Sequence, residues 1–370
     1  MLSRRANWAT PTNALTLAKR RSTLPLLDLT ESNPTTAGLA YPFDELSDVM
    51  ARAARATYDP DPLGIRSARE ALAAELRCEV DDLVLTASTS EAYSFLFKLL
   101  CDPGEAVLTA TPSYPLLEHL AALELIELRS FALELQRRWE IEPARVRAAL
   151  AAAPRTRAIV VVNPNNPTGS YVTAAEQETL ASFGIPLISD EVFHPFAFGA
   201  PPPSLVRDDV LTFTLGGLSK SAGLPHYKLG WIRISGPAAA RREARQALEL
   251  IADNFLSVAT PVQIALPELL RIAPRIRDAI RQRTAANLEL LRGAVARLPA
   301  ATLLPVEGGW TAALRLPRVE SDEELALRLI EEHGVIVHPG YFFDFDHDGY
   351  VVVSLLTKPE TFAKGIDALL

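Results

Sequence analysis

The chain has 370 residues, of which 48% are hydrophobic, so it can bury a large core, and we expect two domains or one domain with an appendage. Its 37 basic and 45 acidic side chains give a net charge of −8, which argues against nucleic acid or an anionic membrane as a partner. No stretch approaches the ~18 apolar residues of a membrane span, and we expect a cytoplasmic protein.

Short apolar runs alternate with amphipathic stretches from about Asp81 to Ile234. Apolar runs lie at residues 82–86, 105–110 and 157–163, and helical patterns follow them at residues 90–100, 114–123 and 174–183. This alternation is typical of βαβ units, in which a parallel sheet is buried on both faces. Further strands are predicted at residues 185–190, 210–216 and 228–234.

Beyond Gly236 the pattern changes to long helices. Helical patterns cover residues 238–255 and 274–298, and a further helix is predicted at residues 321–333 between strands at 311–316, 335–339 and 350–356. This combination predicts a second, smaller α+β domain. We place the large domain at residues 46–260, and the small domain at residues 1–45 together with 261–370.

Lys220 lies in a Gly- and Ser-rich turn, LGGLSKSAGL, between two predicted strands. Such a turn holds a lysine amine at the carboxyl ends of the strands, where ligands of open α/β sheets bind. A lysine that forms Schiff bases must lose its proton near neutral pH, which partial burial or a nearby cation achieves. Taken alone, this lysine fits a solvated surface residue better.

Two further motifs favour a functional interpretation of the lysine. Asp190 ends a strand in ISDEVF with no adjacent lysine or arginine, so its burial would be costly without a cation, and a protonated pyridine nitrogen is such a cation. Asn166, in the rigid turn of VVVNPNNPTG, presents an amide donor suited to a cofactor's phenolic oxygen. A helix cap at Asp190 and a simple tight turn at NNPTG remain the structural alternatives. The three motifs together favour a cofactor site.

The order NPNNPTG, DEV and LSK, at roughly this spacing, resembles the class I/II aminotransferases, and the likeness extends over nearly the whole chain. The resemblance implies the α/β fold of fold type I, with a mostly parallel seven-stranded sheet between helices in the large domain and a smaller α+β domain. It implies pyridoxal 5'-phosphate (PLP) as the cofactor. Lys220 would form the Schiff base, Asp190 would pair with the pyridine nitrogen and Asn166 would donate to the phenolic oxygen.

The resemblance also assigns the remaining contacts of the cofactor. Tyr114, in TPSYP, would stack on the pyridine ring, and Tyr58 would reach the phosphate of the neighbouring subunit, which implies a homodimer with shared sites. We expect Asn33 to contact the substrate. Backbone amides at a helix N-terminus in TASTSEA would bind the phosphate. The expected phosphate-binding residues are Ser88, Thr89, Ser90, Ser219 and Lys228.

This chain departs from the family pattern at four positions. Ser88 replaces a glycine in the phosphate turn, and Lys228 replaces an arginine, so a point charge stands where the family has a bidentate fork. Phe193 replaces a tyrosine that donates to the phenolic oxygen. Val352, in GYVVVSLL, replaces the arginine that binds the substrate α-carboxylate. Lys358, Arg66 and Arg233 are the candidate cations that the sequence leaves for that role.

The sequence therefore predicts a PLP-dependent aminotransferase that takes an amine or amino acid and a keto acid, with a substrate that departs from the standard ones. A PLP-dependent lyase, acting by β-elimination of a C–S bond or by decarboxylation, keeps the same cofactor and is the alternative. A non-catalytic PLP-binding sensor attached to a DNA-binding module is disfavoured by the acidic charge.

Other reactive side chains receive structural interpretations. Cys78 and Cys101 form no recognisable disulfide or zinc pattern, and we expect two core thiols. The DFDHDG cluster at residues 344–349 is predicted to be a polar turn, and no metal site is expected. His194 and His226 flank the predicted site and are expected to be peripheral.

Overall fold

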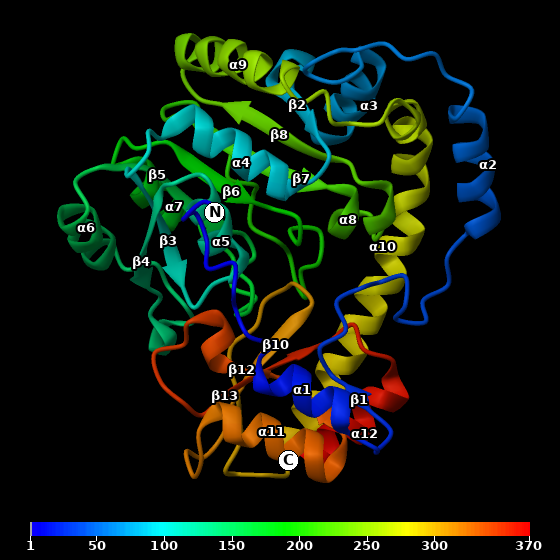
Figure 1. Ribbon diagram of the computed structural model, residues 1–370, viewed down its shortest axis with the longest axis vertical. Helices are drawn as coiled ribbons and strands as arrows, with labels where there is room; N and C mark the ends of the chain where they lie inside the picture. Colours follow the sequence, from blue (N-terminus) through cyan, green and yellow to red (C-terminus); the bar gives the residue numbers. More distant parts are fainter. Residues whose placement is uncertain (1) are drawn as a thin grey trace.

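The computed structural model describes residues 2–370 of the chain. Seven strands form one sheet and four strands form a second, and the long helix α10 (Thr260–Val295) runs from one to the other (Figure 1). No helix among the described residues is both long and apolar enough to cross a membrane.

The large sheet has the order β2-β8-β7-β6-β5-β3-β4 and is parallel except for the pairs that β8 makes with β2 and β7. Most of its strands are buried on both faces, as their continuous apolar runs require. The predicted mostly parallel seven-stranded sheet is thus confirmed. Its strands are β2 (Leu83–Thr86), β3 (Ala106–Thr111), β4 (Glu127–Ala132), β5 (Thr156–Val162), β6 (Leu187–Asp190), β7 (Thr212–Gly217) and β8 (Gly230–Ser235). The edge strand β4 is mostly exposed and has no continuous apolar run, so the pattern did not reveal it.

Helices cover both faces of the large sheet. One face packs against α4 (Thr89–Leu100), α5 (Leu116–Leu123) and α9 (Ala238–Asp253). The other face packs against α3 (Arg66–Leu76), α10, α6 (Pro143–Ala152) and α7 (Ala174–Ala181), and α2 (Phe43–Ala53) packs on the outer side of α10. The helices on the sheet present apolar residues to it at helical spacing, as the buried Ala244, Leu248 and Ala252 of α9 illustrate.

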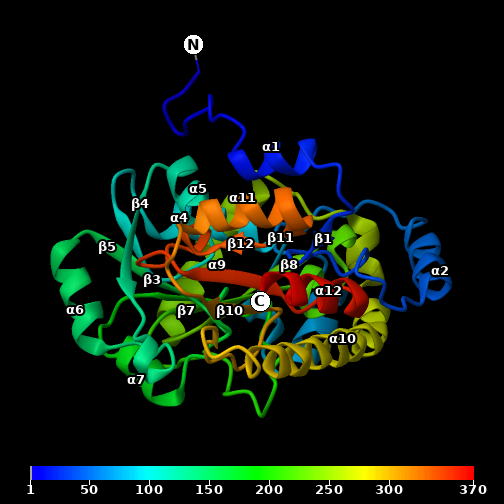
Figure 2. The same ribbon diagram turned by 90° about the horizontal axis from the view of Figure 1, so that it is seen from below.

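The smaller sheet is antiparallel and has the order β12-β13-β10-β9. The N-terminal segment packs with this C-terminal part, because α1 contacts α11 and β1 pairs with β11, as Figure 2 shows from below. The elements are α1 (Ala14–Arg21), β1 (Leu27–Asp28), β9 (Thr302–Leu303), β10 (Thr311–Arg315), α11 (Asp322–His333), β11 (Val335–Ile336), β12 (His338–Pro339), β13 (Tyr350–Ser354) and α12 (Pro359–Leu369). The single strand predicted at 335–339 is therefore two short strands in different sheets.

Helix α10 is longer than its sequence predicts, since we expected a helix from residue 274 and the structure begins it at Thr260. Proline normally interrupts a helix, and α10 contains Pro267 and Pro274. Its buried apolar residues continue at helical spacing on both sides of the prolines, so packing against the large sheet maintains one helix. The remaining short elements are α8 (Leu218–Ser221) and the 3-10 turns η1 (Val80–Asp82), η2 (Leu135–Arg137), η3 (Pro225–Tyr227) and η4 (Gly340–Phe343).

Candidate active site

Lys220 lies on α8, the one-turn helix that follows the carboxyl end of β7. Its Nζ atom donates a hydrogen bond to the carbonyl oxygen of Ser32 at 3.3 Å and lies 5.3 Å from the centre of the Trp310 ring. Burial lowers the pKa of Lys220, while the charge of Asp190 opposes that shift. The lysine amine is therefore held in an enclosed place between the two parts of the chain, where its proton is easier to remove than in water.

Asp190 ends β6 and is 8% exposed. Its carboxylate accepts a hydrogen bond from the hydroxyl of Tyr93 at 3.1 Å and another from the backbone N–H of Val192 at 3.1 Å. Burial nevertheless raises the pKa of Asp190 to about 6. A further cationic donor would stabilise the ionised form of this buried carboxylate, and the protonated nitrogen of a pyridine ring is such a donor. The residues present therefore fit PLP.

The predicted phosphate-binding turn lies at the N-terminus of α4. Ser88 is its N-cap residue, and the Ser88 hydroxyl accepts the backbone N–H of Glu91 at 3.2 Å. Thr89 and Ser90 follow in the first turn, where backbone N–H groups have no partner within the helix and can bind an anion. The Ser88 backbone is extended, with φ of −168°, so the position does not need glycine. Serine is accommodated there because it caps the helix.

Two further predicted phosphate ligands lie in the segment that joins β7 to β8. Ser219 is half-buried and directly precedes Lys220. Lys228 is exposed and ends η3 with φ of 52°, two residues before Gly230. A Cβ atom on Gly230 would lie 3.0 Å from the backbone carbon of Ser88, so glycine allows β8 to approach the start of α4 closely.

Asn166 and Tyr114 lie where their strands β5 and β3 have ended. The Asn166 Oδ1 atom is 3.5 Å from the Thr311 hydroxyl, and the neighbouring Asn165 fixes the turn by donating to Pro112 O at 3.0 Å. Tyr114 is 43% exposed. Burial raises the pKa of Tyr114, and the negative charge of Asp190 raises it further. The Tyr114 ring is thus close enough to Asp190 to respond to its charge.

Asn33 lies in the N-terminal segment that reaches the lysine. It follows Ser32, whose carbonyl accepts the Lys220 amine, and its own side chain is exposed. The Asn33 Oδ1 atom accepts hydrogen bonds from the backbone N–H and the hydroxyl of Thr35, at 3.1 and 2.7 Å. These contacts fix the orientation of Asn33 next to the candidate substrate position.

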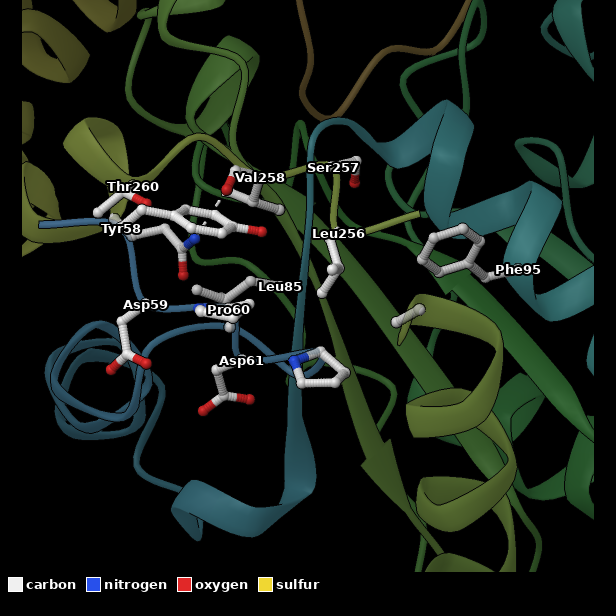
Figure 3. Close-up of a pocket in the computed structure, with 14 residues that line it drawn as sticks. Tyr58, Asp59, Pro60, Asp61, Leu85, Phe95, Leu256, Ser257, Val258 and Thr260 are labelled. Atoms are coloured by element: carbon white, nitrogen blue, oxygen red, sulfur yellow. Dashed lines mark hydrogen bonds between the residues drawn. The ribbon is translucent and has the colours of Figure 1, made fainter. Parts of the chain in front are cut away.

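Tyr58 is not brought together with the other predicted residues. It is 65% exposed and lies in a shallow pocket that it lines with Ser257 and Val258, among others (Figure 3). This pocket borders α4, because the Ser257 hydroxyl donates to Glu91 in the first turn of that helix at 2.7 Å. Tyr58 is therefore exposed on the same side of the chain as the phosphate-binding turn.

Val352 occupies a fully buried position in β13. It lies opposite Ala313 and His338 in the smaller sheet and packs in an apolar cluster. Valine offers no hydrogen bond to a carboxylate. Phe193 also lacks a donor, and its ring packs edge-to-face on Trp310 with the centroids 5.2 Å apart.

The three candidate cations lie on different elements of the fold. Arg66 begins α3, is 69% exposed and pairs with Glu70 at 2.9 Å. Arg233 lies on the sheet face opposite Asp190 and donates to Leu76 O at 3.3 Å. Lys358 is exposed, and its aliphatic stem lies against Gly38.

The sequence analysis did not identify Tyr93 or Trp310. Tyr93 donates a hydrogen bond to Asp190, and the Trp310 ring lies beside the Lys220 amine. Tyr93 lies four residues after Thr89 on α4, and this spacing places the two on one helix face. Helical periodicity could therefore have placed Tyr93 on the same side of the helix as a predicted site residue. Trp310 directly precedes β10 of the smaller sheet, 90 residues beyond Lys220 in the chain, and no local pattern connects the two.

The other reactive side chains lie outside this site. No group of three or more metal-binding side chains occurs among residues 2–370. Cys78 and Cys101 are half-buried free thiols, and burial raises the pKa of each. The His194 ring packs edge-to-face on Tyr171, and His226 is exposed.

Comparison with known proteins supports one family. Residues 25–369 match the family described as aminotransferase class I and II. The chain is 27% identical to the tyrosine aminotransferase of Mus musculus over 360 residues, which cover 89% of this chain and 77% of that protein. It is 32% identical to nicotianamine aminotransferase 1 of Oryza sativa subsp. japonica over 271 residues, 68% of this chain and 54% of that protein. A single mutant of the aspartate aminotransferase from Thermus thermophilus has a TM-score of 0.86 and 25% identity, with 100% of both chains covered.

Proposed function

The chain belongs to the aminotransferase class I and II family, whose members depend on PLP, and we propose that it transfers an amino group from an amine donor to a keto acceptor with Lys220 as its catalytic residue. When bound, PLP supplies an aldehyde for the lysine amine and a ring that withdraws electrons from the substrate. The observation that carries this proposal is the position of Lys220 beside the buried Asp190, at the ends of adjacent strands.

Lys220 has two roles in this proposal. Its neutral amine would hold the aldehyde of PLP, and burial of Lys220 favours this neutral form by lowering its pKa. The same amine would carry a proton to and from the reacting carbon of a bound substrate. The Ser32 carbonyl orients the amine through the 3.3 Å hydrogen bond.

The surrounding residues hold the cofactor. Asp190 accepts the ring N–H and keeps that nitrogen protonated, with Tyr93 hydrogen-bonded to its carboxylate. Asn166 donates to the phenolic oxygen, and Tyr114 stacks on the ring. The phosphate is bound by Ser88, Thr89, Ser90, Ser219 and Lys228. Asn33 contacts the substrate beside Lys220.

The substrate proposed for this enzyme departs from the standard amino acids. Val352 is fully buried in an apolar cluster, Arg66 is exposed and pairs with Glu70, and Arg233 lines the cavity on the other face of the large sheet. A substrate α-carboxylate would consequently lack the bidentate arginine that normally stabilises it. An amine without an α-carboxylate, or an amino acid with an unusual side chain, fits this site better.

The proposed assembly is a homodimer with shared sites, located in the cytoplasm. Tyr58 and the start of α4 lie on one side of the chain, and a two-fold axis through that side would bring each Tyr58 to the phosphate of the other subunit. We divide each subunit into a large domain at residues 46–260 and a small domain formed by residues 1–45 and 261–370.

A spectroscopic half-reaction tests the proposal. The enzyme with bound PLP is mixed with a panel of amine donors in the absence of a keto acid. An aminotransferase converts the cofactor to its amine form and releases one equivalent of keto product. Catalytic release of pyruvate and ammonia, with the cofactor unchanged, would instead support the lyase alternative.

A further inference from the structure

A separate cavity of about 270 Å³ lies between the large sheet and helices α3 and α10. Its wall on the sheet side is formed by β7 and β8, and the short helix α8 borders it. None of the residues assigned to the cofactor or the substrate lines it. The cavity is therefore distinct from the site around Lys220.

This cavity lies behind the active site, on the opposite face of the same strand ends. Asp190 and Glu191 are consecutive residues, and successive side chains of an extended chain point to opposite faces. The Asp190 carboxylate meets Tyr93 of α4, whereas Glu191 lines the cavity. Ser221 lines the cavity too, although it directly follows Lys220 in α8.

Two arginines line the cavity with most of their hydrogen-bonding capacity unused. Together, the guanidinium groups of Arg233 and Arg277 offer about ten N–H donors. Within residues 2–370 they make a single hydrogen bond to protein, from Arg233 to Leu76 O at 3.3 Å. Arg277 faces Glu75 at 3.6 Å, which is beyond hydrogen-bond distance, and its side chain is only 19% exposed. Polar groups in such a place take water or an anion as their partner.

The charges around the cavity favour an anion with a single negative charge. Glu191 is already satisfied, since its two oxygens accept from Asn163, Ser189, Ser204 and the backbone of Leu205 at 2.6–3.3 Å. Glu75 and Glu191 also line the cavity and offset the positive charge of the two arginines. Their repulsion grows with the charge of the ligand, so a dianion such as phosphate is repelled more than a monoanion. A ligand with one carboxylate can accept a bidentate hydrogen bond from either arginine and is repelled less by the two glutamates than a dianion is.

The rest of the lining is apolar, with Leu76, Leu215, Leu218, Trp231 and Leu270 among its members. Ligand sites of this size commonly combine apolar walls with a few polar groups that fix the orientation. We propose that this cavity binds a small organic monocarboxylate, whose carboxylate pairs with Arg233 and Arg277 and whose apolar body packs against these walls.

Binding in this cavity has a consequence at the active site. The ligand touches Leu218 and Ser221, which flank Lys220 on the one-turn helix α8. The Ser221 hydroxyl also donates to the Val192 carbonyl at 3.1 Å, and Val192 in turn donates to Asp190. Occupation of the cavity therefore changes the surroundings of both Lys220 and Asp190.

Benzoate serves as the probe, because it is a monocarboxylate with an apolar body and has no amine or keto group. Its affinity for the PLP-loaded enzyme is measured by calorimetry, and the visible spectrum of the cofactor is recorded in parallel. The variants are Arg277→Met, which removes a guanidinium, and Ala273→Met, which fills the cavity from α10. The matched control is Arg275→Met, because Arg275 lies on the same helix, is 59% exposed and pairs with Glu45.

The proposal expects benzoate affinity to fall at least about tenfold in both cavity variants and to remain unchanged in the control. A crystal soaked with benzoate should show it between Arg233 and Arg277. The proposal is overturned if wild-type enzyme binds no benzoate at about 10 mM, or if affinity is equal in all four proteins. The second result would mean that benzoate binds elsewhere, including at Lys220.

Discussion

At the scale of single residues, Asp190 is a buried carboxylate, and burial makes its ionisation unfavourable. Burial raises its pKa from the ordinary 3.8 to about 6 in the protein without cofactor, although Tyr93 and Val192 donate hydrogen bonds to it. The folded state therefore binds this proton more tightly than the unfolded chain does. A bound pyridinium ring would remove that penalty by pairing with the charged form.

This pKa predicts how the stability of the cofactor-free protein depends on pH. The stabilisation due to the Asp190 proton is fully present below pH 3.8 and is lost as the pH rises through about 6. The loss amounts to about 3 kcal/mol, since one pKa unit corresponds to about 1.4 kcal/mol. Urea unfolding of the wild type and of Asp190→Asn at pH 4 and pH 8 measures it. Between these two pH values, stability should fall by about 2 kcal/mol more in the wild type, because the unfolded carboxyl is already partly ionised at pH 4, and identical pH profiles would contradict the assignment.

Tyr93 supports the same carboxylate through its hydroxyl. Tyr93→Phe removes a donor to a buried charged group, which makes Asp190 more basic and leaves the ring proton nearer to the carboxylate than to the cofactor nitrogen. We expect kcat to fall about tenfold with little change in KM, because the substrate does not touch this residue. The control is Tyr171→Phe, which removes a buried hydroxyl bonded to His194 O. An equal kcat in both variants would show that Tyr93 has only a packing role.

At the scale of elements, the start of α4 combines a structural and a binding role. Ser88 caps the helix, and the free N–H groups of the first turn face the expected phosphate position. Ser321 caps α11 in the same way, with its hydroxyl accepting from Glu324, but far from the cofactor site in the smaller part of the fold.

The two caps provide a matched pair of variants. Ser88→Ala and Ser321→Ala should each lower the free energy of unfolding by about 1 kcal/mol, because each removes one side-chain cap. Only Ser88→Ala should also weaken PLP binding, by about tenfold, since Ser88 is an expected phosphate ligand. Titration of the cofactor-free proteins with PLP measures this difference. The same PLP affinity in both variants would place the phosphate elsewhere.

Most of the strands and part of the candidate site could be predicted from the sequence alone. Continuous apolar runs predicted six of the seven strands of the large sheet, because a strand buried on both faces leaves that pattern. The exposed β4 left none, and packing extends α10 towards the N-terminus beyond Pro274, where the sequence predicted its start. Lys220, Asp190 and Asn166 were recognisable from local motifs. Trp310 and the cavity behind α8 were not, because their contacts join segments far apart in the chain, and for Tyr93 only its spacing from Thr89 on α4 was a signal.

At the scale of the whole molecule, the proposed homodimer gives the exposed Tyr58 a role. Its side chain is 65% exposed and lies apart from Lys220 of its own chain. In a dimer with shared sites, each site uses Lys220 from one subunit and Tyr58 from the other. A residue that acts across an interface in this way can be complemented by the partner.

A hybrid dimer tests this arrangement. One chain carries Lys220→Ala and the other Tyr58→Ala, and differently tagged chains are coexpressed so that the hybrid can be purified. One of its two sites is then intact and the other carries both changes, so the hybrid should have about half the wild-type activity while both parent dimers are impaired. A hybrid no more active than the mean of its parents would indicate that Tyr58 serves its own subunit or no site.

The measurement that tests the central claim most directly is the steady-state kinetics of the wild-type enzyme with different amine donors. In the proposed site the buried Val352 takes the place of an arginine fork, and an unpaired carboxylate in an enclosed site costs a few kcal/mol, or about two orders of magnitude in kcat/KM. Aspartate, glutamate and alanine should therefore be poor donors, although the cofactor is bound normally, and amines without an α-carboxylate or amino acids with unusual side chains should be better. Efficient transamination of any of these three amino acids would contradict the account.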